Sequence, residues 1–187
     1  MSNTKSNGKV AFITGGNRGL GLETARELGR QGIVVVIGSR DSQKGEAAAA
    51  KLRDEGITAE SLGFDVNKSK DGQKAYDYFE KKYGRLDILV NNAGVLKEGQ
   101  ISATGSVPNP VTAVSSEMLR ETFETNFFAS VALTQKLLPL VRKTPAGRIV
   151  NVSSILGSLT LHSDTTPEAT ARLLPGHTNS ADGETNR

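Results

Sequence analysis

The feature that most limits how this chain can fold is a glycine-rich segment between an apolar run and a helical pattern. Val10–Ile13 is apolar, Thr14–Gly21 contains four glycines, and helical spacing of apolar residues follows. Glycines allow a tight turn and let a ligand approach the backbone, because no Cβ intervenes. The first turn of the next helix offers unpaired N–H groups and the positive end of a dipole. This order predicts a phosphate cradle for a nucleotide cofactor; a glycine-rich surface turn is the alternative.

Strand-like and helix-like segments alternate as far as about residue 153. We predict strands at Val10–Thr14, Ile33–Ile37, Thr58–Phe64, Ile88–Val90 and Arg148–Ser153. We predict helices at Leu20–Gln31, at Ala47–Leu52 with Asp41 as its cap, at Lys70–Lys82 and at Ser116–Arg142, and a surface loop over residues 95–114. Such alternation is typical of an α/β fold, a doubly wound, Rossmann-like parallel sheet with helices on both faces and right-handed crossovers.

The long helix and the end of the chain carry two further expectations. Polar and apolar residues at helical spacing predict one buried stripe: Leu119, Phe123, Asn126, Ser130, Thr134, Leu137 and Val141. From Thr160 onward the chain is rich in Thr, Ser, Gly and Pro, with no aromatic residue and no lysine. We therefore expect one domain over residues 1–160 and a poorly ordered tail over 161–187, with room for one short helix at Glu168–Leu174.

Composition excludes several classes of function. The net charge is only +3 and the charges are interspersed, so we expect no nucleic-acid partner. The absence of cysteine excludes disulfides and thiolate metal sites, and we expect no metal. Met1–Lys9 is polar and no apolar run approaches the length of a membrane span, so we expect a cytoplasmic protein without a membrane partner.

Four motifs resemble those of the short-chain dehydrogenase/reductase family. Their residues are most similar to those of its carbonyl-reductase-like branch. They are Thr14-Gly-x-x-x-Gly19-x-Gly21, Asn91-Asn92-Ala93-Gly94, Asn126 within Thr125–Phe128, and Asn151-Val-Ser-Ser154. The resemblance covers residues 8 to about 160. It implies NADPH-dependent reduction of a small-molecule carbonyl, an aldehyde, ketone or quinone, by hydride transfer.

The cofactor preference can be read from the end of the second strand. An NAD-binding unit needs an acid there, about twenty residues beyond the glycine turn, to bind the ribose 2′-OH. In this chain that count reaches Ser39 and Arg40. Arg40, together with Arg18 from the glycine turn, would instead bind a 2′-phosphate by charge-assisted contacts. We therefore predict NADP(H) over NAD(H); two solvated surface arginines are the alternative.

The resemblance also implies roles for residues at the ends of the third and fourth strands. Asp65 and Val66 would meet the adenine ring, whereas a capping or turn aspartate is the alternative. The Asn91–Gly94 segment would brace the sheet and admit the cofactor ribose, unless it is an ordinary turn. The predicted cofactor-binding residues are Thr14, Gly15, Asn17, Arg18, Gly19, Leu20, Gly21, Ser39, Arg40, Asp65, Val66, Asn91, Asn92, Ala93 and Gly94.

Two residues are expected to serve the reaction itself. By resemblance, Asn126 holds a water in a proton relay and Ser154, rather than its neighbour Ser153, hydrogen-bonds the substrate carbonyl oxygen. A buried, hydrogen-bonded asparagine without a catalytic role is the alternative for Asn126. The family's proton donor is a tyrosine followed four residues later by a lysine. No such pair follows Ser154, because the last tyrosine is Tyr83 and the last lysine is Lys143.

The absence of this tyrosine and lysine pair determines what activity we expect. His162 and His177 are the remaining downstream groups that titrate near neutral pH, and a histidine in a polar tail is usually solvated. We expect a truncated or frame-altered version of a longer reductase with poor turnover; the alternative is a non-catalytic NADP-binding or partner-interaction protein. A sugar-nucleotide epimerase fits less well, because that class usually shows Gly-x-x-Gly-x-x-Gly.

The same argument predicts exposed surfaces. Without further strands the fifth strand would be an open sheet edge, through which the chain could self-associate. The long helix would lack a neighbour and expose Leu137, Leu138 and Val141.

Overall fold

The computed structural model describes most of the chain as far as the fifth predicted strand. It covers residues 8–97, 99–102, 105–108 and 114–154, and beyond them only 160, 163, 164, 166 and 168. The chain divides into two compact units, Met1–Asn151 and Val152–Arg187. Almost all of the predicted tail, including His162 and His177, lies outside the described residues.

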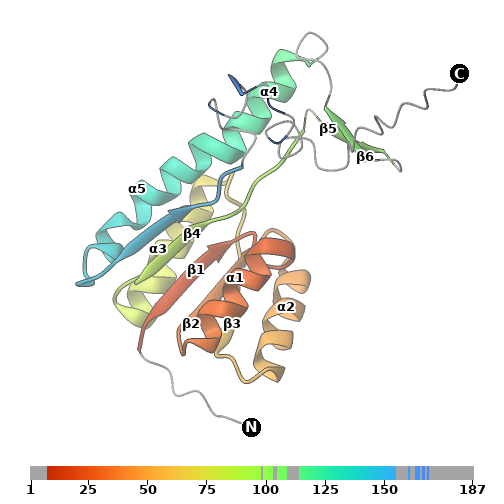
Figure 1. Cartoon of the computed structure of the whole chain (residues 1–187). Coiled ribbons are helices and arrows are strands. Elements are labelled where there is room, and N and C mark those ends of the chain that lie inside the picture. The colour runs from red at the N-terminus through yellow and green to blue at the C-terminus, as the bar shows by residue number, and fades with distance from the viewer. Residues whose placement is uncertain are drawn as a thin grey trace, which may run out of the picture. The chain divides into compact units, whose positions relative to one another are not determined.

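Five parallel strands form the main sheet, in the order β3-β2-β1-β4-β7 (Figure 1). Their bounds are Val10–Thr14 for β1, Val34–Ser39 for β2, Ala59–Gly63 for β3, Ile88–Asn91 for β4 and Arg148–Asn151 for β7. The chain starts at the central strand, moves outward to β3 and then returns to the other side of β1 as β4. Open α/β sheets bind ligands at such a reversal, outside the carboxyl ends of the strands.

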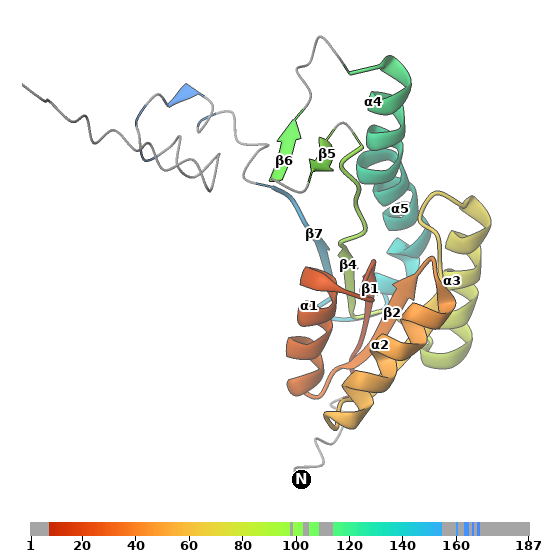
Figure 2. The same cartoon turned by 90° about the vertical axis from the view of Figure 1, so that its right-hand side faces the viewer.

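Helices cover both faces of this sheet (Figure 2), which confirms the predicted doubly wound α/β fold. Helices α1 (Gly19–Arg30) and α2 (Ser42–Asp54) lie on one face, and α3 (Ser69–Tyr83) and α5 (Ala129–Val141) on the other. Along β1 the side chains alternate between the two cores, with Val10 and Phe12 facing α3 and α5, and Ala11 and Ile13 facing α1 and α2. No helix within the described ranges is long and apolar enough to cross a bilayer.

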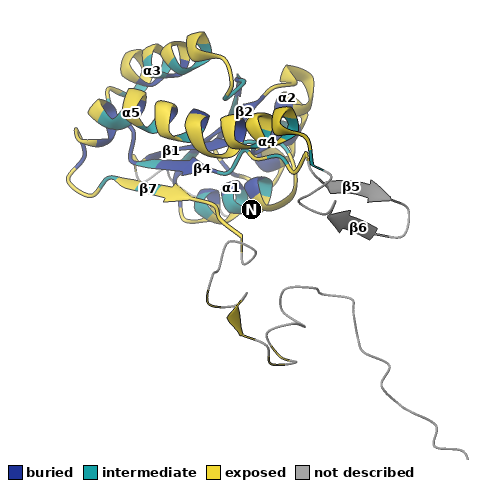
Figure 3. Cartoon of the chain, turned by 90° about the horizontal axis from the view of Figure 1, so that it is seen from above, coloured by how far each residue is buried: buried dark blue, intermediate teal, exposed yellow. Residues whose placement is uncertain are grey.

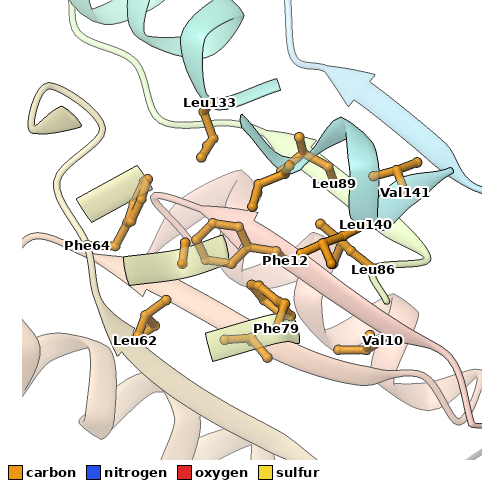
Figure 4. Close-up of a cluster of buried hydrophobic side chains, with 13 residues drawn as sticks. Val10, Phe12, Leu62, Phe64, Phe79, Leu86, Leu89, Leu133, Leu140 and Val141 are labelled. Carbon is orange, nitrogen blue, oxygen red and sulfur yellow. The ribbon is translucent and has the colours of Figure 1, made fainter. Parts of the chain in front are cut away.

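Phe12 lies at the centre of the core beneath α3 and α5 (Figure 4). Its ring centroid is 5.2 Å from that of Phe64, at the end of β3, and 5.2 Å from that of Phe79 in α3. Leu89 of β4 and Leu140 of α5 belong to the same fully buried cluster. Burial of these side chains fixes α3 and α5 against the strands whose ends form the candidate site.

The start of α2 follows the sequence prediction. Asp41 caps the helix, because its carboxylate accepts hydrogen bonds from the backbone N–H groups of Gln43 and Lys44, at 3.0 and 3.1 Å. The Lys44 backbone bond is the main cause that holds the pKa of Asp41 below its ordinary value.

The prediction of a continuous surface loop over residues 95–114 is wrong in part. Two short antiparallel strands, β5 (Gly99–Ser102) and β6 (Gly105–Pro108), form a separate two-stranded sheet within it. Glycine and proline are depleted in strands, so their presence here favoured a loop. The backbone pairing of Gln100 with Val107 and of Ile101 with Ser106 forms the hairpin despite that composition.

The long helix is interrupted, and the predicted stripe is wrong in its first half. Helix α4 (Ser116–Phe123) leads through a π-helical turn, η2 (Glu124–Phe128), into α5. The side chains buried along η2 and α5 are Thr125, Ala129, Leu133, Leu137, Leu140 and Val141. A π turn contains more residues than an α turn, so it rotates the buried face away from the 3.6-residue pattern. As a result Phe123 is 58% exposed, and Asn126 is exposed rather than on the buried stripe.

The prediction that Leu137, Leu138 and Val141 would be exposed is also wrong. Leu137 and Val141 are buried and Leu138 is half-buried. Leu137 and Val141 pack in the same core as Phe12 and Phe79, so α3 and the sheet provide the cover that the sequence argument overlooked. The large apolar side chains that are exposed on this helix are Leu119, Phe123, Phe127, Phe128 and Val131.

Candidate functional site

A cavity of about 310 Å³ lies at the carboxyl ends of β1, β2 and β4. Eleven of the predicted cofactor-binding residues line it: Gly15, Asn17, Arg18, Gly19, Leu20, Gly21, Arg40, Val66, Asn92, Ala93 and Gly94. The structure thus brings together the glycine turn, the end of β2 and the segment after β4, which lie up to about eighty residues apart in the sequence.

The glycine turn has the geometry of a phosphate cradle, and side chains at its glycine positions would obstruct it. Gly15 and Gly19 have φ angles of 64° and 54°, a region that L-residues rarely adopt. A Cβ on Gly15 would lie 3.0 Å from Cα of Ala93, and one on Gly21 would lie 2.4 Å from Nδ2 of Asn92. The turn therefore needs glycine for close packing against the β4 segment, and it leaves the start of α1 open to an anionic group.

Thr14 does not line the cavity, but it holds the wall of the cavity in place. Its hydroxyl accepts hydrogen bonds from the backbone N–H groups of Asn92 and Ala93, both at 3.0 Å, and donates to the carbonyl of Val90 at 3.3 Å. The side-chain amide of Asn92 donates to the carbonyl oxygens of Thr14 and Gly15, at 2.9 and 3.2 Å. These bonds fasten the segment after β4 to the glycine turn.

The cavity is lined by two cations and by no acid. Arg18 and Arg40 are its charged lining residues, and both are exposed. Within the described part of the chain, no ion pair or side-chain hydrogen bond engages either guanidinium group. Asp41, the acid nearest in sequence to Arg40, is occupied as the cap of α2. An anion entering here would meet two guanidinium groups without competition.

Ser39 lies beside this region but not on the cavity wall. Its side chain is buried, and its hydroxyl donates to the carbonyl of Asp41 at 2.8 Å. Ser39 therefore shapes the turn that carries Arg40 rather than facing the cavity.

The lining of the cavity also includes residues that the sequence analysis missed. These are Gly38, Phe64, Asn67, Val95 and Thr125. The Asn67 side-chain amide donates to Oγ1 of Thr125 at 2.9 Å, joining the loop after β3 to η2. This contact spans 58 positions in the sequence, so no local pattern could have revealed it.

Asp65 was predicted beside Val66, yet only Val66 lines the cavity. The carboxylate of Asp65 accepts a bond from the backbone N–H of Asn67 at 3.1 Å, and its own N–H donates to Asp71 at 2.8 Å. The local turn before α3 thus uses the polar groups of Asp65, as the alternative interpretation of a turn aspartate anticipated.

Asn126 contacts the segment that follows β4 through both ends of its amide. Its Oδ1 accepts from the N–H of Val95 at 2.8 Å, and its Nδ2 donates to the carbonyl of Val95 at 2.7 Å. A Cβ on Gly94 would lie 3.3 Å from the same Oδ1. Asn126 does not line the cavity itself, but the π turn places its amide against Gly94 and Val95, which do. π turns often mark functional positions in helices.

Asn91 is buried, does not line the cavity and connects β4 with α5 and β7. Its Nδ2 donates to Oγ1 of Thr134 in α5 at 2.9 Å and to Oδ1 of Asn151 in β7 at 2.8 Å. Its own Oδ1 is buried, with no partner in the described part of the chain. Asn91 therefore braces the sheet, the role that the sequence analysis gave to this segment.

Ser154 belongs to the second compact unit, Val152–Arg187, and is exposed. It follows the last residue of β7, Asn151, by three positions. The predicted strand Arg148–Ser153 thus ends two residues earlier than expected.

Comparison with known proteins supports the same kind of fold. The family model for short chain dehydrogenases matches residues 9–166. (+)-Neomenthol dehydrogenase from Capsicum annuum is 33% identical over 86% of this chain, and the NADPH carbonyl reductase 1 from Homo sapiens is 38% identical over 82% of it. The solved structure of salutaridine reductase from Papaver somniferum aligns with a TM-score of 0.72 at 28% identity, covering 82% of this chain and 60% of that one.

A metagenomic short-chain oxidoreductase, solved in complex with NADP, aligns with a TM-score of 0.70 at 28% identity, over 91% of this chain and 72% of that one. The chain spans 60% of the length of the neomenthol dehydrogenase and 52% of that of the carbonyl reductase. From the motifs, the doubly wound sheet and the family match over residues 9–166, we conclude that this chain belongs to the short chain dehydrogenase family.

Proposed function

We propose that this chain binds NADP(H) in the cavity at the carboxyl ends of β1, β2 and β4, and that its site is built for NADPH-dependent reduction of a small carbonyl compound. The observation that carries the proposal is a cavity lined by Arg18 and Arg40 and by no acid. The relatives support it, because two of them are named for NADPH or were solved with NADP.

Each part of the cavity suits a different part of the cofactor. The glycine turn and the start of α1 would hold the diphosphate. Arg18 and Arg40 would bind the 2′-phosphate, with Val66 against the adenine. Asn92, Ala93 and Gly94 would leave room for the ribose next to the nicotinamide, because Gly94 has no Cβ to block it.

When bound, NADPH supplies a hydride to a carbonyl carbon. Asn126, held by Val95, would keep a water at the cavity wall, and Ser154 would donate a hydrogen bond to the carbonyl oxygen. The sequence holds no tyrosine after Tyr83 and no lysine after Lys143, so the chain of 187 residues lacks the usual group to supply the proton. We therefore expect cofactor binding with little turnover from this chain.

A non-catalytic NADP-binding or partner-interaction protein is the second candidate function. The absence of a tyrosine and lysine pair beyond Ser154 favours it. The oxidation of NADPH in the presence of aldehydes and quinones separates the two candidates: rapid turnover would contradict our account of the proton donor, and its absence alongside tight NADPH binding would favour the second.

Calorimetric titration of the chain with NADPH and with NADH tests the proposed cofactor. We expect NADPH to bind more tightly, and Arg40→Ala to lose roughly 10- to 100-fold in NADPH affinity while NADH affinity stays the same, since a charge-assisted contact contributes about 1.5–3 kcal/mol. Arg30→Ala is the matched control, because Arg30 is an exposed arginine in an ion pair with Glu27 away from the cavity. Equal affinity for both cofactors in the unaltered chain would refute the role of Arg18 and Arg40.

A further inference from the structure

Among the residues that the structure describes, strand β7 forms one edge of the main sheet, and one side of its backbone has no strand partner. It pairs with β4 in parallel, and the N–H of Arg148 donates to the carbonyl of Asp87 at 2.9 Å. In a strand, the N–H and C=O groups of one residue point to the same side, and alternate residues point to opposite sides. The groups of Ile149 and Asn151 therefore face outward, and within the described ranges no strand pairs with them.

Apolar exposure accompanies this open edge. Val150 is 46% exposed, whereas every residue of the central strand β1 is buried. Figure 3 shows the same contrast, with β7 largely exposed beside the buried β1 and β4. An exposed edge with apolar side chains is a site for pairing with another strand.

The opposite edge of the sheet, β3, is occupied by side chains. The N–H of Val35 donates to the carbonyl of Thr58, so the groups of Ala59 and Gly63 face outward. Arg53 of α2 donates to the carbonyl of Ala59, and Lys74 of α3 donates to the carbonyl of Gly63, both at 3.0 Å. Charged groups placed on an edge in this way oppose the addition of a strand.

β3 also carries an inward-pointing charge. Oε1 and Oε2 of Glu60 accept hydrogen bonds from the hydroxyls of Tyr83 and Tyr78, at 2.6 and 2.5 Å, and Lys82 forms an ion pair with the same carboxylate. In β7, by contrast, no side-chain hydrogen bond within the described ranges reaches the backbone carbonyl of Ile149 or of Asn151, and Arg148 is the single charged residue of the strand.

We propose that two copies of this chain associate through β7, side by side and antiparallel, about a two-fold axis at Val150. In this register Ile149 of each copy exchanges two hydrogen bonds with Asn151 of the other, which satisfies all the outward groups. The two Val150 side chains meet at the axis as a close, non-hydrogen-bonded pair. An identical pair of strands is self-complementary about a two-fold axis, so one surface serves both copies.

The charges on β7 permit a second copy to pair there, and, within the described part of the chain, the dimer leaves no further free edge of the main sheet for growth. The two Arg148 residues lie four positions apart along the paired strands, about 14 Å, which exceeds the Debye length of about 10 Å at 0.1 M salt. After pairing, both remaining edges are β3 edges blocked by Arg53 and Lys74, so growth stops at the dimer. A strand of four residues buries less than the roughly 1,000 Å² of a stable interface, so the dimer depends on concentration.

Sedimentation velocity of the full chain over a wide range of concentration tests the proposal. We expect a monomer that converts to a dimer and no further, and Val150→Lys to abolish the dimer by placing two ammonium groups against each other. Val131→Lys is the matched control, because Val131 is 41% exposed on α5, and it should still dimerise. A monomer at every concentration, larger assemblies, or a dimer that survives Val150→Lys would each overturn the proposal.

A cross-link provides a second test if Val150→Lys fails to fold, as judged by circular dichroism. The chain has no cysteine, so Val150→Cys introduces a single thiol. Cα atoms of a non-hydrogen-bonded pair lie within disulfide reach, so oxidation should give a linked dimer much faster than for Val131→Cys. Equal rates for the two variants would contradict the register. Neither test requires a cofactor, so the outcome is independent of the proposed function.

Discussion

At the scale of single residues, the cavity depends on backbone atoms that come closer than side chains would permit. Gly21 is the clearest case, because it is buried at the start of α1 beneath the Asn92 amide. That amide is fixed by its bonds to Thr14 and Gly15 and has little freedom to move aside. The cradle and the wall of the cavity therefore constrain each other.

Gly21→Ala should disturb this contact. A Cβ there would lie 2.4 Å from Nδ2 of Asn92 and 2.7 Å from the carbonyl of Gly15. We expect the free energy of unfolding to fall by about 1–3 kcal/mol, the usual cost of overpacking. Urea denaturation measures the change, with Gly72→Ala as the control, since its Cβ would meet nothing closer than 4.0 Å and alanine favours a helix. Equal stability of Gly21→Ala and the unaltered chain would refute the close contact.

At the scale of elements, α3 is joined to the edge strand β3 by the carboxylate of Glu60. Burial by itself would raise the pKa of this carboxyl, but the bonds from Lys82, Tyr78 and Tyr83 outweigh it and hold the pKa below its ordinary value of 4.5. Burial, and then the hydrogen bond to Glu60, raise the pKa values of both tyrosines, so their hydroxyls stay protonated as donors.

The stability of the protein should therefore depend on Glu60 in acid. Because the folded state lowers this pKa, the carboxylate stabilises the fold above pH 4.5, and the contribution disappears as the pH falls through the folded value. We expect Glu60→Gln to be less stable than the unaltered chain at neutral pH, and the difference to shrink below pH 4.5. Urea denaturation from neutral pH to below pH 4.5 measures this difference in the free energy of unfolding.

Glu27→Gln provides the comparison for this experiment. Glu27 forms an exposed ion pair with Arg30 on α1, so its loss should change the free energy of unfolding by less than about 1 kcal/mol. A difference in the free energy of unfolding between Glu60→Gln and the unaltered chain that stays constant from neutral to acid pH would contradict this link between the ionisation of Glu60 and stability.

At the scale of the whole first unit, two cores on opposite faces of one sheet hold the helices in place. The core under α3 and α5 contains Phe12, whose ring contacts both Phe64 and Phe79. The core under α1 and α2 contains Ile13 and Ile37. Since β1 contributes to both, damage to this strand should weaken the unit as a whole.

Phe12→Ala should lower the free energy of unfolding by about 3–5 kcal/mol, because it removes a fully buried ring and leaves a cavity. Phe127→Ala is the control, since Phe127 is 54% exposed, and it should cost much less. Urea denaturation followed by circular dichroism compares the two variants. Similar decreases in the free energy of unfolding for both variants would show that the core is not centred on Phe12.

The sequence and the structure agree best where a local pattern carried the information. The apolar run before the glycine turn was predicted as a covered strand, and Asp41 before the second helix was predicted as its cap. The register of the long helix was not predictable in this way, because the π turn at Glu124–Phe128 breaks the 3.6-residue period without any marker residue. The hairpin at Gly99–Pro108 was missed because its glycines and proline resemble those of a loop.

The sequence alone therefore determined the class of fold, and it predicted the glycine turn and the two arginines as parts of a cofactor site, because each depends on neighbouring residues or on a fixed count along the chain. Only the tertiary structure decided that Asp65 and Ser39 form local hydrogen bonds, that Asn67 contacts Thr125, and that Arg53 and Lys74 donate to backbone carbonyls at the β3 edge of the sheet. Those outcomes depend on which distant side chains reach a given carbonyl or hydroxyl, and that is set by the packing of helices on the sheet.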